Sequence, residues 1–458
     1  MKQPAINSAE FNRREFLKGG SVAAAMTLLG GVELIAQQET EKVAEAAAVE
    51  SKVKCAVIGL GVWGREITNT LLRLPQVEVA TVCDTYPASL RRGATLAPNA
   101  KRTEDYRTIL SDKEIAAVVV ATPTHLHKDI ALAALKAGKH VYCEAPLAHT
   151  VEDAREIARA AKDAYKQIFQ PGLQLRSDNQ RLYVQRNIRS GELGRFAMVR
   201  AQWHKKQSWR FASPNPEREK ALNWRVQKDI SPGLIGEIGI HQIDQVAWFL
   251  DKLPLSVSSF GAITNWDDGR EVADTVQAVF EFPTRTRLVY DATLASSFDS
   301  EHEIFYGSNA TVVMRENRAW MFKEADSPLA GWEVYARKEV FVPNNETGIV
   351  IAADASKQVT HLQKAPEPAP LLKTPLQQAL EAFVGNCAEF SAEVQDFNDA
   401  YDTNDRAAFE KHMADNFKPR PAANCQAGFA ATVMALTANE AVVKGEKVVF
   451  KKEWFELA

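Results

Sequence analysis

The sequence predicts an α/β protein with two folded parts: a parallel-sheet domain over residues 51–175, and an α+β domain with a large, mostly antiparallel open sheet over residues 176–458. Short apolar runs alternate with helical patterns in the first part, which is typical of βαβ units. Longer segments of period two follow in the second part and indicate strands with one exposed face. Residues 1–50 are expected to be a leader and a linker.

Each apolar run of the first part precedes a helical pattern. We expect strands at 53–58, 77–83, 116–121 and 140–143, and helices at 65–74, 88–96, 128–137 and 151–164. In the second part, strands are expected at 196–206, 256–264, 274–282, 287–295, 301–305, 310–314 and 447–451. Helices are expected there at 235–250, 377–397 and 428–443, with a stiff proline-rich connector at 366–370.

Composition excludes several classes of function. The net charge is only −3, so no general positive field would attract nucleic acid or an anionic membrane surface. The five cysteines are too scattered for a disulfide framework. Neither Cys-x-x-Cys nor His-Glu-x-x-His occurs, so no metal site is expected, and no membrane span is expected in the mature protein. A small neutral substrate fits this composition.

The run Gly59-Leu60-Gly61-Val62-Trp63-Gly64 lies where the first strand should meet the first helix. This spacing is the dinucleotide-binding fingerprint of a Rossmann domain. Gly59 allows the tight turn, Gly61 lets the backbone approach a pyrophosphate, and Gly64 allows close packing of the helix on the strand. The helix that follows the turn directs its amide end at the phosphates, so Val62 and Trp63, within the turn, are also expected at the cofactor.

Asp84 follows the fingerprint by about 20 residues, at the end of the second predicted strand. A carboxylate at this position is the expected partner of a ribose 2′-hydroxyl and would repel a 2′-phosphate, so it favours NAD over NADP. Arg91 and Arg92 lie close enough in sequence to accept a phosphate, although arginines on a helix are more often solvated.

The N-terminus carries Asn12-Arg13-Arg14-Glu15-Phe16-Leu17-Lys18 ahead of a weakly apolar run at 22–29. This order is typical of a twin-arginine export signal, with a candidate cleavage site at 44–46; a plain basic tail is the alternative. Such a signal suits a protein that folds and loads its cofactor before the export machinery moves it to the periplasm. Because a periplasm lacks a pool of soluble dinucleotide, we expect a tightly bound carrier that is regenerated in its own site.

Two further turns are specific: Ala121-Thr122-Pro123-Thr124-His125-Leu126-His127, and Cys143-Glu144-Ala145-Pro146-Leu147. With the fingerprint and the segment 233–244, they resemble the glucose-fructose oxidoreductase and inositol dehydrogenase (Gfo/Idh/MocA) family over residues 52–455. The resemblance implies an NAD(P)-dependent oxidoreductase for a carbohydrate substrate, often paired through its sheet into a homo-oligomer. It places the nicotinamide half of the cofactor near Thr122, Pro123, His127, Glu144 and Ala145.

The sequence departs from the family pattern at two positions. The lysine of the family's Glu-Lys-Pro turn is Ala145 here, and the first acid of its Asp-x-Gly-x-His-x-x-Asp helix is Glu237. Oxidation of an alcohol needs a base for the hydroxyl proton. We expect His241 to be this base, because it lies one helical turn from Glu237 and its ordinary pKa is about 6.5. Glu237 would orient the imidazole or bind a sugar hydroxyl, and Asp244 is expected within reach of the substrate.

Other side chains are expected around the same substrate. His204 or Lys205, at the end of the strand predicted at 196–206, could replace the missing lysine, and strand alternation lets only one of them point inward. An ordinary charged strand end is the alternative for Lys205. Trp224 and Arg225 are expected to line the substrate site, because aromatic surface and polar groups suit a sugar ring; a core position is the alternative for the tryptophan.

Three functions remain open at this point. The first is a periplasmic oxidoreductase for a sugar, polyol or glycoside with internally recycled NAD. The second is a redox-neutral glycosidase that oxidises a ring hydroxyl, eliminates the aglycone, adds water and returns the hydride; the family includes such enzymes, and some of them also lack the turn lysine. The third is a cofactor-binding protein without catalysis, in which Ala145 marks a loss of function.

Overall fold

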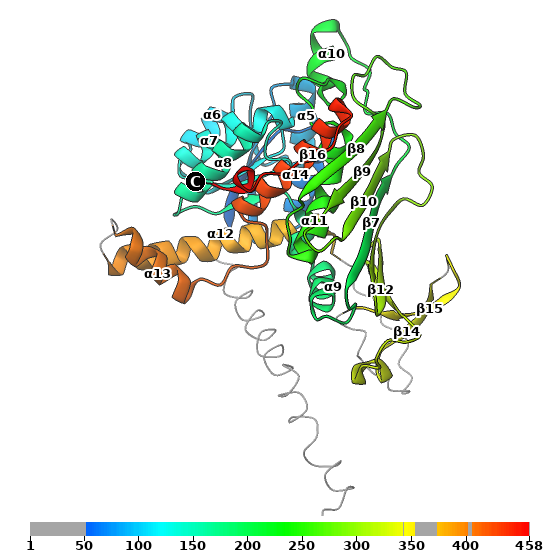
Figure 1. Ribbon diagram of the computed structural model, residues 1–458. Helices are drawn as coiled ribbons and strands as arrows, with labels where there is room; N and C mark the ends of the chain where they lie inside the picture. The colour runs from blue at the N-terminus through cyan, green and yellow to red at the C-terminus, as the bar shows by residue number, and fades with distance from the viewer. Residues whose placement is uncertain (1–51, 342, 353–372, 402–404, 458) are drawn as a thin grey trace, which may run out of the picture. The chain divides into compact units, whose positions relative to one another are not determined.

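The structure is a computed structural model that describes residues 52–341, 343–352, 373–401 and 405–457; the predicted leader and the connector at 366–370 lie outside them. The described chain contains a six-stranded sheet and a ten-stranded sheet (Figure 1). The predicted fold class is confirmed, because a Rossmann-type parallel sheet precedes a large, mostly antiparallel sheet.

The first sheet is doubly wound. All its strands are parallel, in the order β3-β2-β1-β4-β5-β6, so the chain reverses direction across the sheet between β1 and β4, where such folds bind ligands. Its strands are β1 (Val53–Ile58), β2 (Val77–Cys83), β3 (Lys101–Thr103), β4 (Ala117–Val120), β5 (His140–Cys143) and β6 (Phe169–Pro171). Its helices are α4 (Val62–Leu71), α5 (Pro87–Leu96), α6 (Tyr106–Ser111), α7 (His127–Lys136) and α8 (Val151–Asp163).

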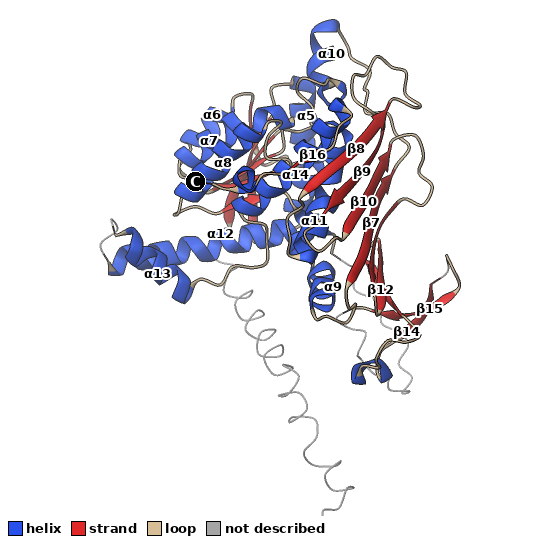
Figure 2. Cartoon of the chain, in the orientation of Figure 1, coloured by secondary structure: helices blue, strands red, loops and turns tan. Residues whose placement is uncertain are grey.

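The second sheet has the order β14-β15-β13-β12-β11-β7-β10-β9-β8-β16, with β7 and β10 as parallel neighbours (Figure 2). Its strands are β7 (Phe196–His204), β8 (Ser256–Ala262), β9 (Thr275–Glu281), β10 (Arg287–Thr293), β11 (Glu301–Gly307), β12 (Ala310–Arg315), β13 (Arg318–Lys323), β14 (Lys338–Phe341), β15 (Glu346–Val350) and β16 (Val448–Val449). One face is apolar and packs against helices, since Val199 and Ala201 of β7 and Leu288 and Tyr290 of β10 are buried.

Two long helices pack on the sheets, and one of them contacts both. Helix α14 (Cys425–Lys444) packs against α8 and β6 of the first sheet and against β8 of the second. Helix α12 (Pro375–Ala400) packs on α4 and β1, so a late part of the chain completes the core on one face of the Rossmann sheet. Helix α13 (Arg406–Asn416) then packs back on α12 through aromatic side chains. Among the described helices, none combines the length and apolar character needed to cross a membrane.

The helix predicted at 235–250 differs from expectation in its first part. Residues Ile235–Gly239 form a π-helix, η5, and the α-helix α11 covers Ile240–Leu250. Glycines allow this close packing, because a Cβ on Gly239 would lie 3.1 Å from the Tyr290 ring and one on Gly236 would lie 2.5 Å from Pro232. Single π-helical turns are frequent at functional sites.

Several elements were not predicted from the sequence. They are β3, α6, β6, β13, β14, β15, α13, the short helix α10 (Pro216–Leu222) and helix α9 (Asn179–Arg189). Most are only a few residues long. Helix α9 is longer but strongly polar, and an ionic contact anchors it, so apolar periodicity gives little signal for it.

A buried ionic network holds α9, α11 and β11 together beneath the second sheet. Arg181 of α9 donates to Oε2 of Glu303 at 2.6 Å and to Oε1 of Gln245 at 2.9 Å. Gln242 donates to Oε1 of Glu303 at 2.9 Å. Arg181 is 5% exposed and Glu303 0%, so each charge depends on its partner for solvation. This network fixes the helix that follows η5.

We expect Glu303→Leu to lower the free energy of unfolding by about 3–5 kcal/mol, because Arg181 would be left as a buried unpaired charge. The double variant Arg181→Met/Glu303→Leu should recover much of this loss. Urea unfolding followed by tryptophan fluorescence measures both. The control is Glu114→Ala, which removes an exposed ion pair with Lys54 and should cost at most about 1 kcal/mol; an equal cost for Glu303→Leu would contradict the account.

Candidate cofactor and active site

The glycine-rich turn joins β1 to α4 at the switch point of the first sheet. Gly59 has φ +97°, and a Cβ there would lie 2.6 Å from the carbonyl oxygen of Ala121. A Cβ on Gly64 would lie 1.9 Å from the carbonyl oxygen of Gly59, so both positions require glycine. A Cβ on Gly61, in contrast, would meet no atom of the described residues within 4 Å. The space beside Gly61 is therefore open, as a phosphate cradle requires.

The N-terminus of α4 faces this open turn. Its first turn contains no acidic residue, and no side chain of the described chain caps it. Val62 and Trp63, the first two residues of the helix, are 66% and 39% exposed although both are apolar. Free amide groups and the positive end of the helix dipole therefore suit a bound anion.

Asp84 lies at the end of β2, next to the glycine turn. Its Oδ2 accepts a hydrogen bond from the amide of Leu60 at 2.8 Å, and its Oδ1 accepts one from the amide of Tyr86 at 2.7 Å. These bonds fix the carboxylate and leave lone pairs on both oxygens for ribose hydroxyls. Arg91 and Arg92 are exposed on α5.

His127 ties together the turns that follow β4 and β5. Its Nδ1 lies 3.0 Å from the carbonyl oxygen of Pro146, and its Nε2 lies 2.9 Å from that of Thr122. Burial lowers the pKa of His127 to about 4, so the ring is neutral and its single N–H donates to one carbonyl at a time. Both ring nitrogens thus face the backbone, and His127 shapes the two turns rather than presenting its ring to a ligand.

Buried polar atoms without partners line these strand ends. Within the described part of the chain, Oγ1 of Thr122 and Oε1 of Glu144 have no hydrogen-bond partner. Burial, with a smaller contribution from the charge of Glu237, raises the pKa of Glu144 to about 7. Ala145 and Pro123 lie beside them and are partly exposed. Unpaired buried polar groups of this kind fit a ligand with amide and hydroxyl groups, so the residues present fit a nicotinamide dinucleotide.

Glu237 of η5 joins the second domain to the first. Its Oε1 accepts a hydrogen bond from Oγ1 of Thr124 at 2.6 Å, and its Oε2 accepts one from Nε of Arg225 at 3.1 Å. Burial raises the pKa of Glu237, while Arg225 and Thr124 oppose the rise. The π-helix therefore places a buried carboxylate directly on the turn that follows β4.

His241 lies at the start of α11, four residues after Glu237. Its Nδ1 is buried and has no hydrogen-bond partner among the described residues. Burial lowers the pKa of His241, and the charge of Asp244 partly opposes this shift. The ring is therefore neutral near pH 7 and can accept a proton.

Asp244 was expected to contact the substrate, but its carboxylate is already bound to Arg176. Asp244 accepts two hydrogen bonds of 2.8 Å from Nε and Nη2 of Arg176, in a bidentate ion pair. Arg176 also stacks over the ring of Trp248 at 5.3 Å. Asp244 is 2% exposed, so it acts on His241 through its charge, and direct substrate contact by this carboxylate is not what the structure favours.

The structure contradicts the prediction that His204 serves the substrate. Its neighbours show which face it occupies: Tyr290 of β10 packs toward Gly239 of η5, whereas Asp291 points to the opposite face. Nε2 of His204 lies 2.5 Å from Oδ2 of Asp291, on that opposite face, and its Nδ1 lies 3.1 Å from the carbonyl oxygen of Phe298. Strand alternation would point Lys205 toward the face that carries η5, but this residue is exposed and lies beyond the end of β7. Its role stays a prediction.

Trp224 and Arg225 lie beside Glu237, in a short 3₁₀ turn. Trp224 is 7% exposed, and its ring centroid lies 5.9 Å from that of His125. Cζ of Arg225 lies 4.5 Å over the Trp224 ring while its Nε binds Glu237. Trp224 is thus buried beneath the Arg225 guanidinium, which is the core position given as the alternative, and Arg225 carries the polar surface beside the buried carboxylate.

Sequence reasoning missed two histidines at this site. The rings of His125 and His149 meet edge to face with centroids 6.2 Å apart. In each ring, Nδ1 is buried and lacks a hydrogen-bond partner in the described chain. A signal was available: His125 follows β4 and His149 follows β5, and the carboxyl ends of adjacent parallel strands meet at one edge of the sheet.

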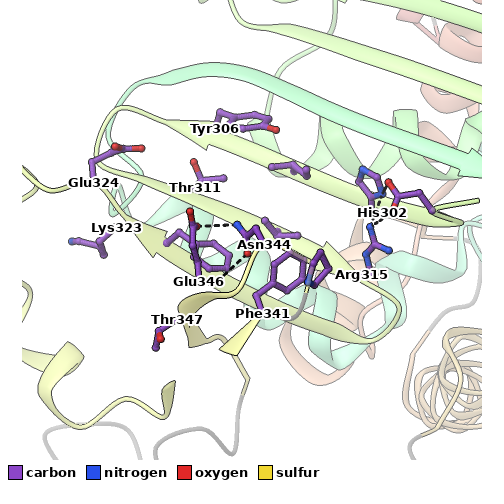
Figure 3. Close-up of a pocket in the computed structure, with 15 residues that line it drawn as sticks. His302, Tyr306, Thr311, Arg315, Lys323, Glu324, Phe341, Asn344, Glu346 and Thr347 are labelled. Atoms are coloured by element: carbon purple, nitrogen blue, oxygen red, sulfur yellow. Dashed lines mark hydrogen bonds and ion pairs between the residues drawn. The ribbon is translucent and has the colours of Figure 1, made fainter. Parts of the chain in front are cut away.

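A cavity on the outer face of the second sheet lies apart from these residues (Figure 3). His302 and Arg315 both face Asp299, with N···O distances of 3.6 and 2.5 Å. His302 pairs across the sheet with Gln202, on the face that also carries His204. The cavity therefore belongs to the outer face and takes no part in the cofactor site.

Comparison with known proteins agrees with this geometry. The model described as "Oxidoreductase family, NAD-binding Rossmann fold" matches residues 53–172, and the model of the GFO/IDH/MocA C-terminal domain matches residues 182–313. The chain belongs to the Gfo/Idh/MocA oxidoreductase family. Residues 10–30 of this Gfo/Idh/MocA chain match the twin-arginine translocation signal sequence, so the protein carries the address for twin-arginine export to the periplasm.

Relatives of this Gfo/Idh/MocA protein act on small carbohydrates. Inositol 2-dehydrogenase of Salmonella typhimurium is 32% identical over 207 residues, which are 44% of this chain and 55% of the relative. The 2,7-anhydro-N-acetylneuraminate hydratase of Escherichia coli is 24% identical over 265 residues, which are 57% of this chain and 67% of the relative. The match thus spans about half the length of the first of these relatives.

A solved structure of levoglucosan dehydrogenase, in complex with NADH and levoglucosan, shares the fold of this family member. The TM-score is 0.62 at 19% sequence identity, over 87% of this chain and 99% of that one. The likeness covers both sheets, so the Rossmann domain and the large sheet domain form one recurring architecture.

We expect Gly61→Val to weaken NAD binding at least tenfold while leaving thermal stability nearly unchanged, because the new side chain would fill open space where a pyrophosphate must approach. Gly331→Val is the matched control, since a Cβ there also meets no atom of the described residues within 4 Å. Isothermal titration with NAD and thermal unfolding measure the two effects. Wild-type affinity in Gly61→Val would show that the cofactor does not use this cradle.

Proposed function

We propose that the protein is a periplasmic oxidoreductase that oxidises a hydroxyl of a sugar, polyol or glycoside and holds and recycles its own NAD. The contact between Thr124 and Glu237 carries this proposal, because it brings the strand ends of a dinucleotide fold to the helix that bears His241. The relatives named as inositol 2-dehydrogenase and levoglucosan dehydrogenase support a carbohydrate substrate. When bound at these strand ends, NAD would supply the hydride acceptor for the substrate carbon and the hydride for the return step.

The residues of the chain supply the other half of the chemistry. His241, neutral because of its burial, accepts the proton of the reacting hydroxyl. Glu237 is held between Thr124 and Arg225 and accepts a hydrogen bond from a neighbouring hydroxyl. Arg225, whose guanidinium is stacked over the buried Trp224 ring, lies beside Glu237 to donate to a sugar hydroxyl. Together these groups orient the substrate and remove its hydroxyl proton.

The geometry near Asp84 supports NAD over NADP. Its carboxylate is fixed beside the turn by two backbone amides, at the position where a 2′-phosphate would meet a negative charge. The two arginines that could have neutralised a phosphate, Arg91 and Arg92, are exposed on α5. An exposed arginine on a helix needs no ligand to explain it.

A clamp across the two domains supports tight binding of the carrier. Helix α10 belongs to the second domain, yet Cζ of its Arg218 lies 3.7 Å from the ring centroid of Tyr86. The amide of Tyr86 donates to Asp84, so the stack lies beside the expected ribose. A dinucleotide bound there would have to open this contact before leaving.

Arg218→Ala should therefore speed the release of bound NAD by roughly three- to thirty-fold, the range expected for losing one cation–π contact. Release is measured by diluting loaded protein into a scavenging dehydrogenase and following dinucleotide fluorescence. Arg107→Ala is the matched control, because Arg107 stacks on Tyr106 at 4.9 Å on α6. Equal release rates for the two variants would contradict a clamp at α10.

A second candidate function is a redox-neutral hydrolase or lyase that works by transient ring oxidation. Two observations favour it. One relative is a hydratase of an anhydro sugar, and Ala145 replaces the lysine that the dehydrogenase pattern contains. In this cycle the hydride returns to the same substrate, so retention of the carrier serves both functions.

The functions separate in one assay on the exported protein without added dinucleotide. In an oxidoreductase, myo-inositol or levoglucosan should reduce the bound carrier, and an added carbonyl compound should then reoxidise it. Near-ultraviolet absorbance records both changes. A redox-neutral hydrolase should instead release the aryl group from aryl glycosides over many turnovers. Protein that does neither, although loaded with NAD, would be a cofactor-binding protein, and the proposal would fail.

A further inference from the structure

Ala145 stands where the family pattern has a lysine, and two imidazoles, His125 and His149, follow the ends of the same two strands, β4 and β5. We propose that His125 and His149 form a proton-transfer pair, which takes the proton released at the Glu237–His241 site and passes it toward solvent. The inference rests on the proposed function, since it needs a hydroxyl that loses its proton. It assigns to two residues the proton exchange that a methyl side chain cannot perform.

The position of His125 connects it to the reacting centre. It directly follows Thr124, whose hydroxyl binds Glu237 at 2.6 Å. Its ring lies 5.9 Å from that of Trp224, which carries the stacked Arg225. His125 therefore directly follows the residue that binds Glu237 from the Rossmann side, whereas His241 lies one helical turn from Glu237 in the second domain.

The position of His149 leads outward. The negative charge of Asp153, in the first turn of α8, favours protonation of His149. Oδ1 of Asp153 also accepts a hydrogen bond from Nζ of Lys128 at 2.6 Å. The side chain of Asp153 is 24% exposed, so it offers a route to water. The chain of groups thus runs from Glu237 through His125 and His149 to a partly exposed ion pair.

The spacing of the two rings suits transfer through one water. With centroids 6.2 Å apart, even nitrogens that face each other would be roughly 4 Å apart, too far for a direct hydrogen bond and within reach of a bridging water. Both Nδ1 atoms are buried and unpartnered among the described residues. Buried polar nitrogens are costly without partners, and a shared water would satisfy both.

Charges around the pair keep it neutral at rest. Burial lowers the pKa of His125, and the neighbouring His149 lowers it further. Burial also lowers the pKa of His149, with Asp153 opposing the shift. His127 is a further titratable group beside His125, since the charge of His125 acts on the pKa of His127. Like charges disfavour double protonation, so the pair holds one proton at a time.

The transfer balances without an added reactant. The O–H bond of the substrate breaks and its proton passes through the imidazoles to water. The electron pair of the C–H bond leaves as hydride to the nicotinamide that the proposed function supplies. During the return half of the cycle, the same pair delivers a proton to the reduced carbonyl oxygen.

Turnover of levoglucosan or myo-inositol by NAD-loaded variants tests the pair, with aryl glycosides used if only those are turned over. His125→Ala should lower kcat about 10²-fold or more at unchanged NAD content and unchanged thermal stability, and added imidazole should restore part of the rate. His149→Asn should lower kcat less and change its pH dependence. The control His412→Asn removes a histidine of α13 that is paired with Glu393 of α12. It should change neither kcat nor its pH dependence.

The pH profile separates proton transfer from a structural role. Both imidazoles must be neutral to accept a proton, so wild-type kcat should fall as pH drops through a pKa below about 6.5. His149→Asn removes the charge that lowers the pKa of His125, so the fall should begin at a higher pH.

The outcomes distinguish the two proposals. Active wild-type protein, with His125→Ala retaining kcat, ignoring imidazole and showing an unchanged pH profile, would overturn the pair alone. Wild-type protein that is loaded with NAD but turns over no sugar and no aryl glycoside would overturn the proposed function and the pair together.

Discussion

One buried hydrogen bond, from Thr124 to Glu237, sets the geometry on which the site depends. Thr124 stands at the carboxyl end of a Rossmann strand, and Glu237 stands in the π-helix that opens the central helix of the other domain. The bond is 2.6 Å long and shielded from water, where a hydrogen bond to a charged group is worth roughly 1.5–3 kcal/mol. Together with the packing of α14 on both sheets, it holds the cofactor half of the molecule against the substrate half.

The rest of the site follows from the cost of burying charge at this junction. Two carboxyls, Glu144 and Glu237, lie close enough for the charge of Glu237 to raise the pKa of Glu144, and Arg225 is bound to Glu237. The imidazoles around them stay neutral because burial lowers their pKa. A neutral base beside a compensated carboxylate can take a proton from an alcohol without leaving an unpaired buried charge.

The sequence predicted the architecture well because its signals are local. The Gly59–Gly64 turn and the apolar runs of β1, β2 and β5 depend only on neighbouring residues, and the observed strands have the predicted limits. The face of His204 depended on sheet alternation, which offered two answers, and only the pairing of β7 with β10 decides between them. Helix α9 is anchored by the pair of Arg181 with Glu303, 122 residues apart, which periodicity does not detect. Likewise His125 and His149 are distant in sequence and meet only because β4 and β5 are neighbours.

We propose that NAD enters the site during folding and stays bound after export. The direct measurement is to purify the mature protein from the periplasm, denature it, and quantify released dinucleotide by mass spectrometry against protein concentration. The account predicts close to one equivalent of NAD per chain, in either redox state. Empty protein that also fails to bind NAD at micromolar concentration would contradict it.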